Sequence, residues 1–187
     1  HIDTRLRILD DEDRPVPRNQ AGHIALRGFN TALRYNGNEE VSAVTWRPIK
    51  GDPEGLCWCF TGDIGVMDDD GKVSIVDRSK DVIITGGETV PSVEVEAAYM
   101  EHPRILECAA VGVEDEKWGE AILLVAAATG LDDGDEALAA DLYQYGRQHL
   151  AGYKVPKKIA FLDALPRSHF GKILKRDLRD RNFDRIY

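Results

Sequence analysis

The sequence has no long hydrophobic run, no apolar leader and few cysteines. No apolar stretch approaches the 18 or more residues of a membrane span, and the first residues, HIDTRLRILDDED, are polar where a secretory signal would be hydrophobic. The three cysteines are Cys57, Cys59 and Cys108, and no second CxxC or HxxxH pair completes the CWC motif as a zinc site. We therefore expect a cytoplasmic, reduced setting, with no transmembrane segment and no metal ligands.

Basic residues are scarce over most of the 187-residue chain. The net charge is −9, but residues 154–187 hold 10 Lys/Arg against 4 Asp/Glu, so the rest of the chain carries −15. An acidic body argues against nucleic acid as a partner. Two interpretations of the basic tail stay open: a solvated helix over Ile173–Arg185, or a phosphate-bearing small molecule bound nearby.

The first 76 residues are predicted to form a β-rich piece of short strands. Polar and apolar residues alternate over 4–9 and 22–27, and residues 56–60 form a compact apolar strand. Residues 65–67 and 72–76 are predicted to form a hairpin around the DDDG turn, whereas 28–46 has no clear pattern. Because the chain opens within a strand pattern, we expect it to be part of a larger protein.

The pattern changes after the glycine pair Gly86-Gly87, where helical spacing appears. Ser92 is predicted to cap a helix that turns Val93, Ala97 and Met100 inward and ends at His102-Pro103. Asp133 and Glu136 resemble a capping box for a helix to about Leu150, with Leu138, Leu142 and Tyr145 inward. Strands are predicted at 82–85, 105–113, 121–129 and 158–162, and a short helix after Lys172. This order indicates an α+β domain whose mixed sheet is flanked by helices.

Four features could carry chemistry. Asp63 lies beside a glycine where the WCF strand is expected to end, where its two oxygens could accept the hydroxyls of a sugar diol. Arg78 offers a planar fork to phosphate or ribose oxygens. Two alternatives without a ligand stay open: Asp63 could simply stabilise a turn, and Arg78 could form a surface ion pair with Asp77 or Asp81.

The other two features are glycine-flexed loops. Gly86-Gly87-Glu88 follows a strand, so it could line a narrow channel or simply make a tight turn. Lys172 follows Gly171 and could be carried to a developing negative charge, or it could open a helix and face solvent. It is not a P-loop lysine, because Ile173 follows it. We assign no role to the neighbouring His169.

The order of four motifs is more specific than any one of them. WCFTGDIG, VDRSKDVIITGGETVPSVEVE, HPRILECAAVGVEDEKWGE and YKVPKKIAFLDALPRSHFGKILKRDLR together resemble the adenylate-forming superfamily of acyl- and aryl-CoA synthetases, luciferases and peptide-synthetase adenylation domains. The resemblance runs from Arg5 to Leu178. It corresponds to the last third of such enzymes, so their phosphate loop and metal-binding glutamate are expected upstream of His1.

The resemblance implies an acid–thiol ligase that uses ATP, Mg²⁺ and CoA to activate a small carboxylic acid, fatty or aryl. Asp63 and Arg78 match the residues that bind the AMP ribose, Lys172 matches the adenylation lysine, and Lys80 occupies the hinge position. Gly86, Gly87 and Glu88 match the border of the CoA pantetheine channel. Thr89 departs from the asparagine common there, which puts CoA contacts at that position in question.

The implied domains are 1–79, the β-subdomain that ends the large AMP-binding domain, and 80–187, a mobile lid with its core at 94–172. The 187 residues alone are expected to be inactive. Two other functions stay open. One is an adenylating enzyme that loads a carrier protein, and the other is a non-catalytic binding module with the lid fold.

Overall fold

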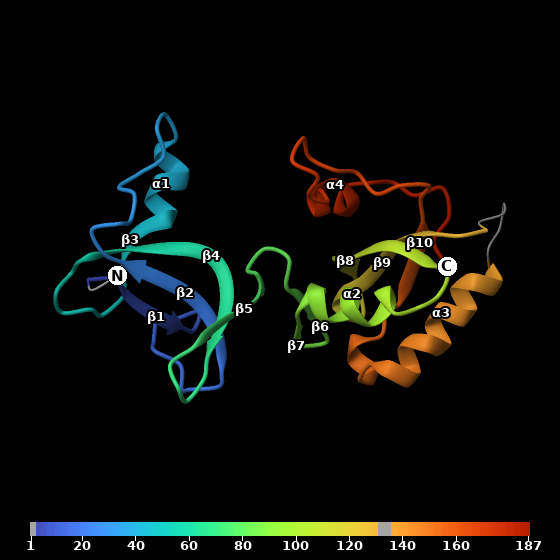
Figure 1. Cartoon of the computed structure of the whole chain (residues 1–187), viewed down its shortest axis with the longest axis horizontal. Helices are drawn as coiled ribbons and strands as arrows, with labels where there is room; N and C mark the ends of the chain where they lie inside the picture. The colour runs from blue at the N-terminus through green and yellow to red at the C-terminus, as the bar shows by residue number, and fades with distance from the viewer. Residues whose placement is uncertain (1–2, 131–135) are drawn as a thin grey trace. The chain divides into compact units, whose positions relative to one another are not determined.

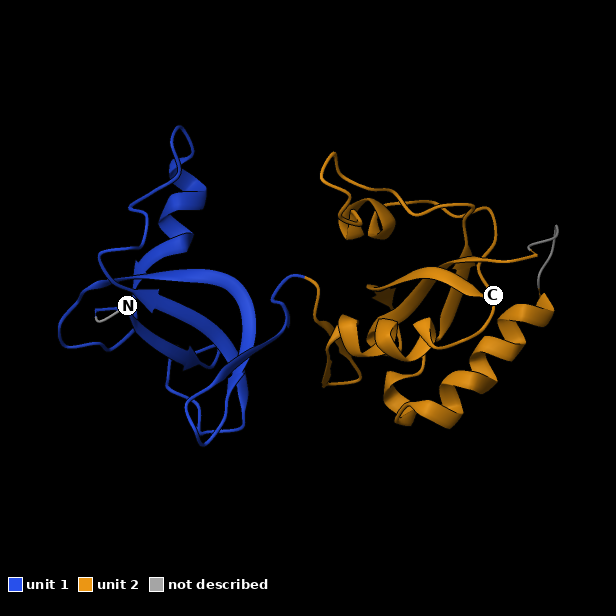
Figure 2. Cartoon of the chain, in the orientation of Figure 1, with its two compact units in different colours: residues 1–80 blue, residues 81–187 orange. Residues whose placement is uncertain are grey.

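The computed structural model describes residues 3–130 and 136–187, and these fall into two compact units, 1–80 and 81–187 (Figures 1 and 2). The first unit contains β1 (Arg5–Leu9), β2 (Ala21–Arg27), α1 (Glu39–Thr45), β3 (Trp46–Pro48), β4 (Cys57–Met67) and β5 (Val73–Arg78). The second contains β6 (Ile83–Thr85), β7 (Glu88–Val90), α2 (Ser92–Met100), β8 (Ile105–Asp115), β9 (Gly119–Ala128), α3 (Glu136–His149), the 3₁₀ turn η1 (Gly152–Lys154), β10 (Lys158–Phe161) and α4 (Lys175–Arg179).

The first unit is an antiparallel sheet in the order β1-β2-β4-β3, with β5 paired to β4. Its small core contains Leu9, Ala25, Ile49 and Trp58. The predicted hairpin is confirmed: β4 and β5 meet at a turn in which the Gly71 N–H donates to the Asp68 carbonyl at 3.1 Å. However, β4 and β5 extend beyond the predicted strands, because they stay paired as far as Asp63 and Arg78.

The second unit confirms the predicted α+β class with a mixed sheet. Its order is β10-β9-β6-β7 with β8 on β9; β10 runs parallel to β9 and the other pairs are antiparallel. Successive side chains of β8 and β9 point to opposite faces of the sheet, so the two strands contribute side chains to two separate hydrophobic cores. Ile122 and Leu124 pack with α2 and α3 on one face, and Leu123 packs with Leu178 of α4 on the other.

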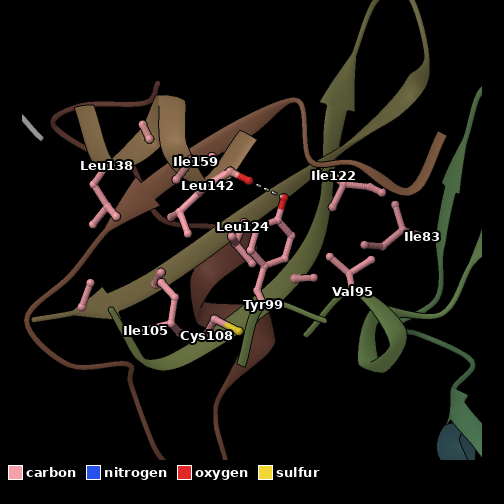
Figure 3. Close-up of a cluster of buried hydrophobic side chains, with 14 of the residues drawn as sticks. Ile83, Val95, Tyr99, Ile105, Cys108, Ile122, Leu124, Leu138, Leu142 and Ile159 are labelled. Atoms are coloured by element: carbon pink, nitrogen blue, oxygen red, sulfur yellow. Dashed lines mark hydrogen bonds between the residues drawn. The ribbon is translucent and has the colours of Figure 1, made fainter. Parts of the chain in front are cut away.

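The core on the α2 and α3 face is built around Tyr99, which is fully buried (Figure 3). Its hydroxyl donates a 3.2 Å hydrogen bond to the Leu142 carbonyl. Burial raises the pKa of Tyr99 well above its ordinary value. The predicted inward residues of α3 are confirmed, since Leu138 and Leu142 are buried and Tyr145 packs against them. The predicted capping residue Asp133 lies outside the described residues.

Three predictions about the helices are wrong. Ser92 does not cap α2: the cap is Pro91, and the Ser92 hydroxyl accepts a hydrogen bond from Lys175. The inward face of α2 is Ser92, Val95 and Tyr99 rather than Val93, Ala97 and Met100, because apolar residues at helical spacing lie on both faces.

The last helix is also shorter than predicted. α4 has five residues, not the thirteen of Ile173–Arg185. The chain then turns back to the sheet, where Tyr187 exchanges two backbone hydrogen bonds with Ile159. Its ring packs on Phe161 at a centroid distance of 5.7 Å. The end of the chain therefore pairs with β10 instead of continuing α4.

Candidate functional site

Asp63 and Arg78 meet across the β4–β5 pair of the first unit. They are direct cross-strand partners, and the Arg78 Nε lies 2.9 Å from the Asp63 Oδ1. The Asp63 side chain is 20% exposed and that of Arg78 is 56% exposed, so the pair faces solvent. The Arg78 side chain thus forms its ion pair with Asp63, while the Arg78 backbone N–H donates to the Asp77 Oδ1 at 2.7 Å. A carboxylate and a guanidinium held together in this way offer both acceptors and donors to a ligand.

Asp63 does not follow the end of a strand as predicted. It lies inside β4, at a bulge in which Thr61, Gly62 and Asp63 stand opposite Ile24 of β2. Gly62 has φ +76°, a conformation that glycine adopts at little cost. The Thr61 hydroxyl accepts from the Asp63 N–H at 3.1 Å, and the Gly62 carbonyl accepts from the Ser79 N–H at 2.9 Å. Bulges of this kind redirect side chains next to functional sites.

Gly86 and Gly87 form a two-residue turn between β6 and β7. Both have positive φ, +60° and +83°, which is the signature of a type I′ hairpin. Glu88 begins β7 and is exposed. The predicted tight turn at Gly86-Gly87 is therefore confirmed, and because the turn is exposed, its backbone is accessible to solvent.

An aromatic and basic cluster next to this turn was missed from the sequence. The Gly86 N–H donates to the Trp118 carbonyl at 2.9 Å, and Trp118 lies in the turn between β8 and β9. The Lys117 and Lys157 ammoniums lie 4.7 Å and 5.9 Å from the Trp118 ring centroid. The EKWG and YKVPKK stretches carry these residues, but only the sheet brings them together.

Lys172 lies on a tight loop between Arg167 and Ile173, which form an isolated bridge. The Ser168 N–H donates to the Lys172 carbonyl at 2.8 Å, and the Ser168 hydroxyl accepts from the Lys172 N–H at 3.2 Å. Gly171 has φ +79°. Lys172 is exposed and precedes α4 by three residues, so it does not open the helix. Within residues 3–130 and 136–187, its ammonium has no hydrogen-bond or ion-pair partner.

The structure thus places the predicted residues in two groups. Asp63 and Arg78 belong to the first unit, and Gly86 to Glu88 and Lys172 belong to the second. Lys80, the predicted hinge, is the last residue of the first unit. In the part of the chain that the structure describes, no three His, Cys, Asp or Glu side chains gather in a way that could hold a metal ion.

The chain is similar to known proteins in both sequence and structure. The AMP-binding enzyme C-terminal domain matches residues 94–172. The structure is similar to o-succinylbenzoate CoA synthetase from Bacillus subtilis in complex with its acyl-adenylate intermediate, with a TM-score of 0.80 and 30% identity over 97% of this chain. Residues 94–172 form an AMP-binding enzyme C-terminal domain, and the similar solved structures are adenylate-forming enzymes. This confirms the resemblance inferred from the four motifs.

CoA ligases and a further ATP-bound enzyme are similar to nearly the whole chain. A long-chain-fatty-acid–CoA ligase of Salmonella typhimurium is 41% identical over 178 residues, which is 95% of this chain and 29% of that enzyme. A feruloyl-CoA synthase of an Amycolatopsis species is 39% identical over 95% of this chain and 34% of its own length. ATP-bound MatB from Rhodopseudomonas palustris has a TM-score of 0.79 at 32% identity, and 34% of it is covered.

The chain therefore spans about a third of the length of the relatives it matches. In residues 3–130 and 136–187, no helix has the length and apolar character needed to cross a membrane.

Proposed function

We propose that the chain serves an ATP-dependent carboxylate–CoA ligase that forms an acyl-adenylate and then an acyl-CoA thioester. The observation that carries this proposal is the Asp63–Arg78 pair, positioned by the Thr61–Asp63 bulge and open to solvent. Relatives 39% and 41% identical over 95% of the chain are a feruloyl-CoA synthase and a long-chain-fatty-acid–CoA ligase, which supports this chemistry and a fatty or aryl acid as substrate.

In the first half-reaction, a carboxylate oxygen attacks the α-phosphorus of ATP and the bond to the leaving pyrophosphate breaks. Asp63 accepts hydrogen bonds from the ribose hydroxyls, and Arg78 donates to the ribose while it keeps Asp63 oriented. The unpaired ammonium of Lys172 offsets the charge that gathers between the carboxylate and the α-phosphate. A preorganised donor of this kind typically contributes about 10²–10³ in rate.

In the second half-reaction, the CoA thiolate attacks the acyl carbonyl carbon and AMP leaves. The exposed Gly86-Gly87 turn borders the path of the pantetheine arm, because its backbone carries no Cβ to obstruct a ligand. Trp118, with Lys117 and Lys157 beside its ring, presents an aromatic face and two positive charges next to this turn. Such a surface suits the aromatic base and phosphates of CoA.

The two units have separate tasks in this proposal. Residues 1–79 are the β-subdomain of the large AMP-binding domain, and residues 80–187 are the lid, with its core at 94–172. Lys80 is the hinge about which the lid turns, first to deliver Lys172 and then to present Gly86 to Glu88. Rigid rotation of this kind is a common way to alternate two chemical steps at one site.

ATP and CoA are substrates in this scheme, and Mg²⁺ would be expected to accompany ATP. The described residues gather no cluster of His, Cys, Asp or Glu side chains that could hold the ion. Small carboxylic acids, ATP and CoA are thus the proposed partners. Nucleic acid is not among them.

The acceptor decides between CoA ligation and carrier-protein loading. An amide bond synthetase from Marinactinospora thermotolerans also resembles this chain, with a TM-score of 0.74, so acceptor chemistry varies among similar structures. The full-length protein should be supplied with ATP, fatty and aryl acids, and either free CoA or a phosphopantetheinyl carrier protein. Thioester on free CoA supports the proposal. Acyl transfer to the carrier protein alone would replace it with the second candidate.

A further inference from the structure

Two ion pairs fix the chain on either side of Lys172. Before it, Arg167 pairs with Glu107 of β8 and donates from Nη1 to the Gly171 carbonyl at 2.7 Å. After it, the Lys175 Nζ lies 2.6 Å from Glu96 Oε1 and donates to the Ser92 hydroxyl at 2.6 Å. The loop that carries the proposed adenylation lysine is therefore anchored to a strand at one end and to a helix at the other.

Both anchoring carboxylates are also bound to the sheet or to the chain that leaves it. Glu96 Oε1 accepts from the Ala110 N–H of β8 at 2.9 Å, and Glu107 Oε1 accepts from the Leu165 N–H at 2.8 Å. The Leu165 N–H and, next, the Arg167 guanidinium hold the pKa of Glu107 below its ordinary value of 4.5. Each carboxylate thus links the Lys172 segment to a fixed backbone group of the lid.

Shielding distinguishes the Lys175–Glu96 pair from the neighbouring Arg176, whereas the Arg167 side chain of the other pair is 46% exposed. The Lys175 side chain is 15% exposed, whereas that of its neighbour Arg176 is 82% exposed and lies 3.6 Å from the Asp177 carboxylate. Exposed pairs of the Arg176 kind contribute little to structure. A shielded ammonium with two oxygen partners defines a single position for the start of α4.

We infer that Lys175 with Glu96, and Arg167 with Glu107, are positioning pairs that hold the Lys172 loop in the shape needed for acyl-adenylate formation. This inference rests on the proposed function, in which Lys172 acts in that step. Lys172 itself has a flexible four-carbon stem and follows a glycine of positive φ, so neither its side chain nor the adjacent backbone fixes the position of its ammonium. A displacement of about 1 Å at a reacting group can cost on the order of 10²-fold in rate.

The pairs could instead serve only the stability of the lid, and the two half-reactions separate these roles. Lys172 is needed to form the acyl-adenylate but not to transfer the acyl group from an acyl-adenylate supplied ready-made. A positioning role therefore predicts loss in the first half-reaction alone. A purely structural role predicts loss in both, because the same lid presents the Gly86-Gly87 turn in the second.

The experiment uses the full-length protein with four variants: Lys175→Met, Lys175→Arg, Glu107→Gln and the control Arg176→Met. Pyrophosphate exchange reports the first half-reaction, and thioester formation from supplied acyl-adenylate reports the second. Lys175→Met and Glu107→Gln should each slow the first about 10- to 100-fold and leave the second within about twofold. Lys175→Arg keeps the charge and should retain most of the first rate. Arg176→Met should match the parent protein in both.

A Lys172→Ala arm separates failure of the inference from failure of the proposed function. If Lys172→Ala slows adenylation and neither Lys175→Met nor Glu107→Gln does, the positioning inference is wrong and the function stands. Equal loss in both half-reactions for both variants would also overturn it. If Lys172→Ala itself leaves adenylation unchanged, the proposed function fails first. Using both sides of the loop keeps the test decisive when one variant does not fold.

Discussion

The Gly86-Gly87 turn allows a single added methyl group to test the proposed division between the two half-reactions. Gly86 has φ +60°, and a Cβ at this position would lie 3.0 Å from the Trp118 Cε3. An alanine in the left-handed region costs about 1–2 kcal/mol, and the contact with the indole ring adds to this cost. β6 and β7 have three residues each, so the hairpin has little local stability to offset it.

We expect Gly86→Ala to shift the equilibrium between this turn and other conformations about 5- to 30-fold against the turn, which is 1–2 kcal/mol expressed as an equilibrium constant. Thioester formation from supplied acyl-adenylate should fall by up to the same factor in the full-length protein. Pyrophosphate exchange should be unchanged, because Lys172 lies on a different loop.

The matched control is Gly51→Ala. Gly51 also has positive φ, +78°, but among the described residues, its two chain neighbours aside, none has an atom within 4 Å of the Cβ position, and it belongs to the first unit. It should impose a similar backbone cost and leave both half-reactions intact. Equal loss of both half-reactions in Gly86→Ala, or an unchanged thioester step, would refute the assignment of this turn to the second half-reaction.

Three further predictions concern the proposed nucleotide site and the stability of the second unit. Asp63→Asn removes the charge that pairs with Arg78 and should raise the KM for ATP about 10- to 100-fold, as measured by steady-state kinetics. Gly146→Ala places a Cβ 2.0 Å from the Tyr99 hydroxyl, so chemical denaturation should show a free energy of unfolding lower by about 1–3 kcal/mol, although alanine in place of glycine usually stabilises a helix. Adding Tyr99→Phe removes the hydroxyl and should recover part of the lost stability. Because the pKa of Glu107 is lowered in the folded protein, its carboxylate contributes fully to the free energy of unfolding above pH 4.5, and this contribution is lost as the pH falls through the folded-state pKa. The difference in free energy of unfolding between the parent protein and Glu107→Gln should therefore disappear in acid, as measured by chemical denaturation at a series of pH values.

The second unit could be predicted largely because its strands and α3 have strong, regular patterns. The apolar runs of β8 and β9 and the inward Leu138 and Leu142 follow directly from strand length and helical spacing. α1 was missed because none of its residues is buried, so no apolar pattern marks it. A local signal was present: the Asn38 side chain accepts from the Val41 N–H at 3.1 Å, followed by two glutamates in the first turn.

The pairing of Asp63 with Arg78 could not be read from the sequence. Continued from Met67–Val73 and Gly65–Ile75, the hairpin register would place Asp63 opposite Asp77. A bulge between Ile64 and Gly65 shifts the register by one residue and brings Arg78 opposite Asp63 instead. Bulges depend on how neighbouring strands pack and have weak sequence signals. The anchoring of Lys175 by Ser92 was hidden for a similar reason, since Ser92 was interpreted as a helix cap.

The measurement that tests the central claim most directly is pyrophosphate exchange by the full-length protein with Lys172→Ala, beside thioester formation from supplied acyl-adenylate. The proposed function predicts that the exchange falls about 10²–10³-fold and that the thioester step is unchanged. If Lys172→Ala forms acyl-adenylate at the parent rate, Lys172 is not the adenylation lysine. The lid would then be a binding module rather than part of a catalytic site.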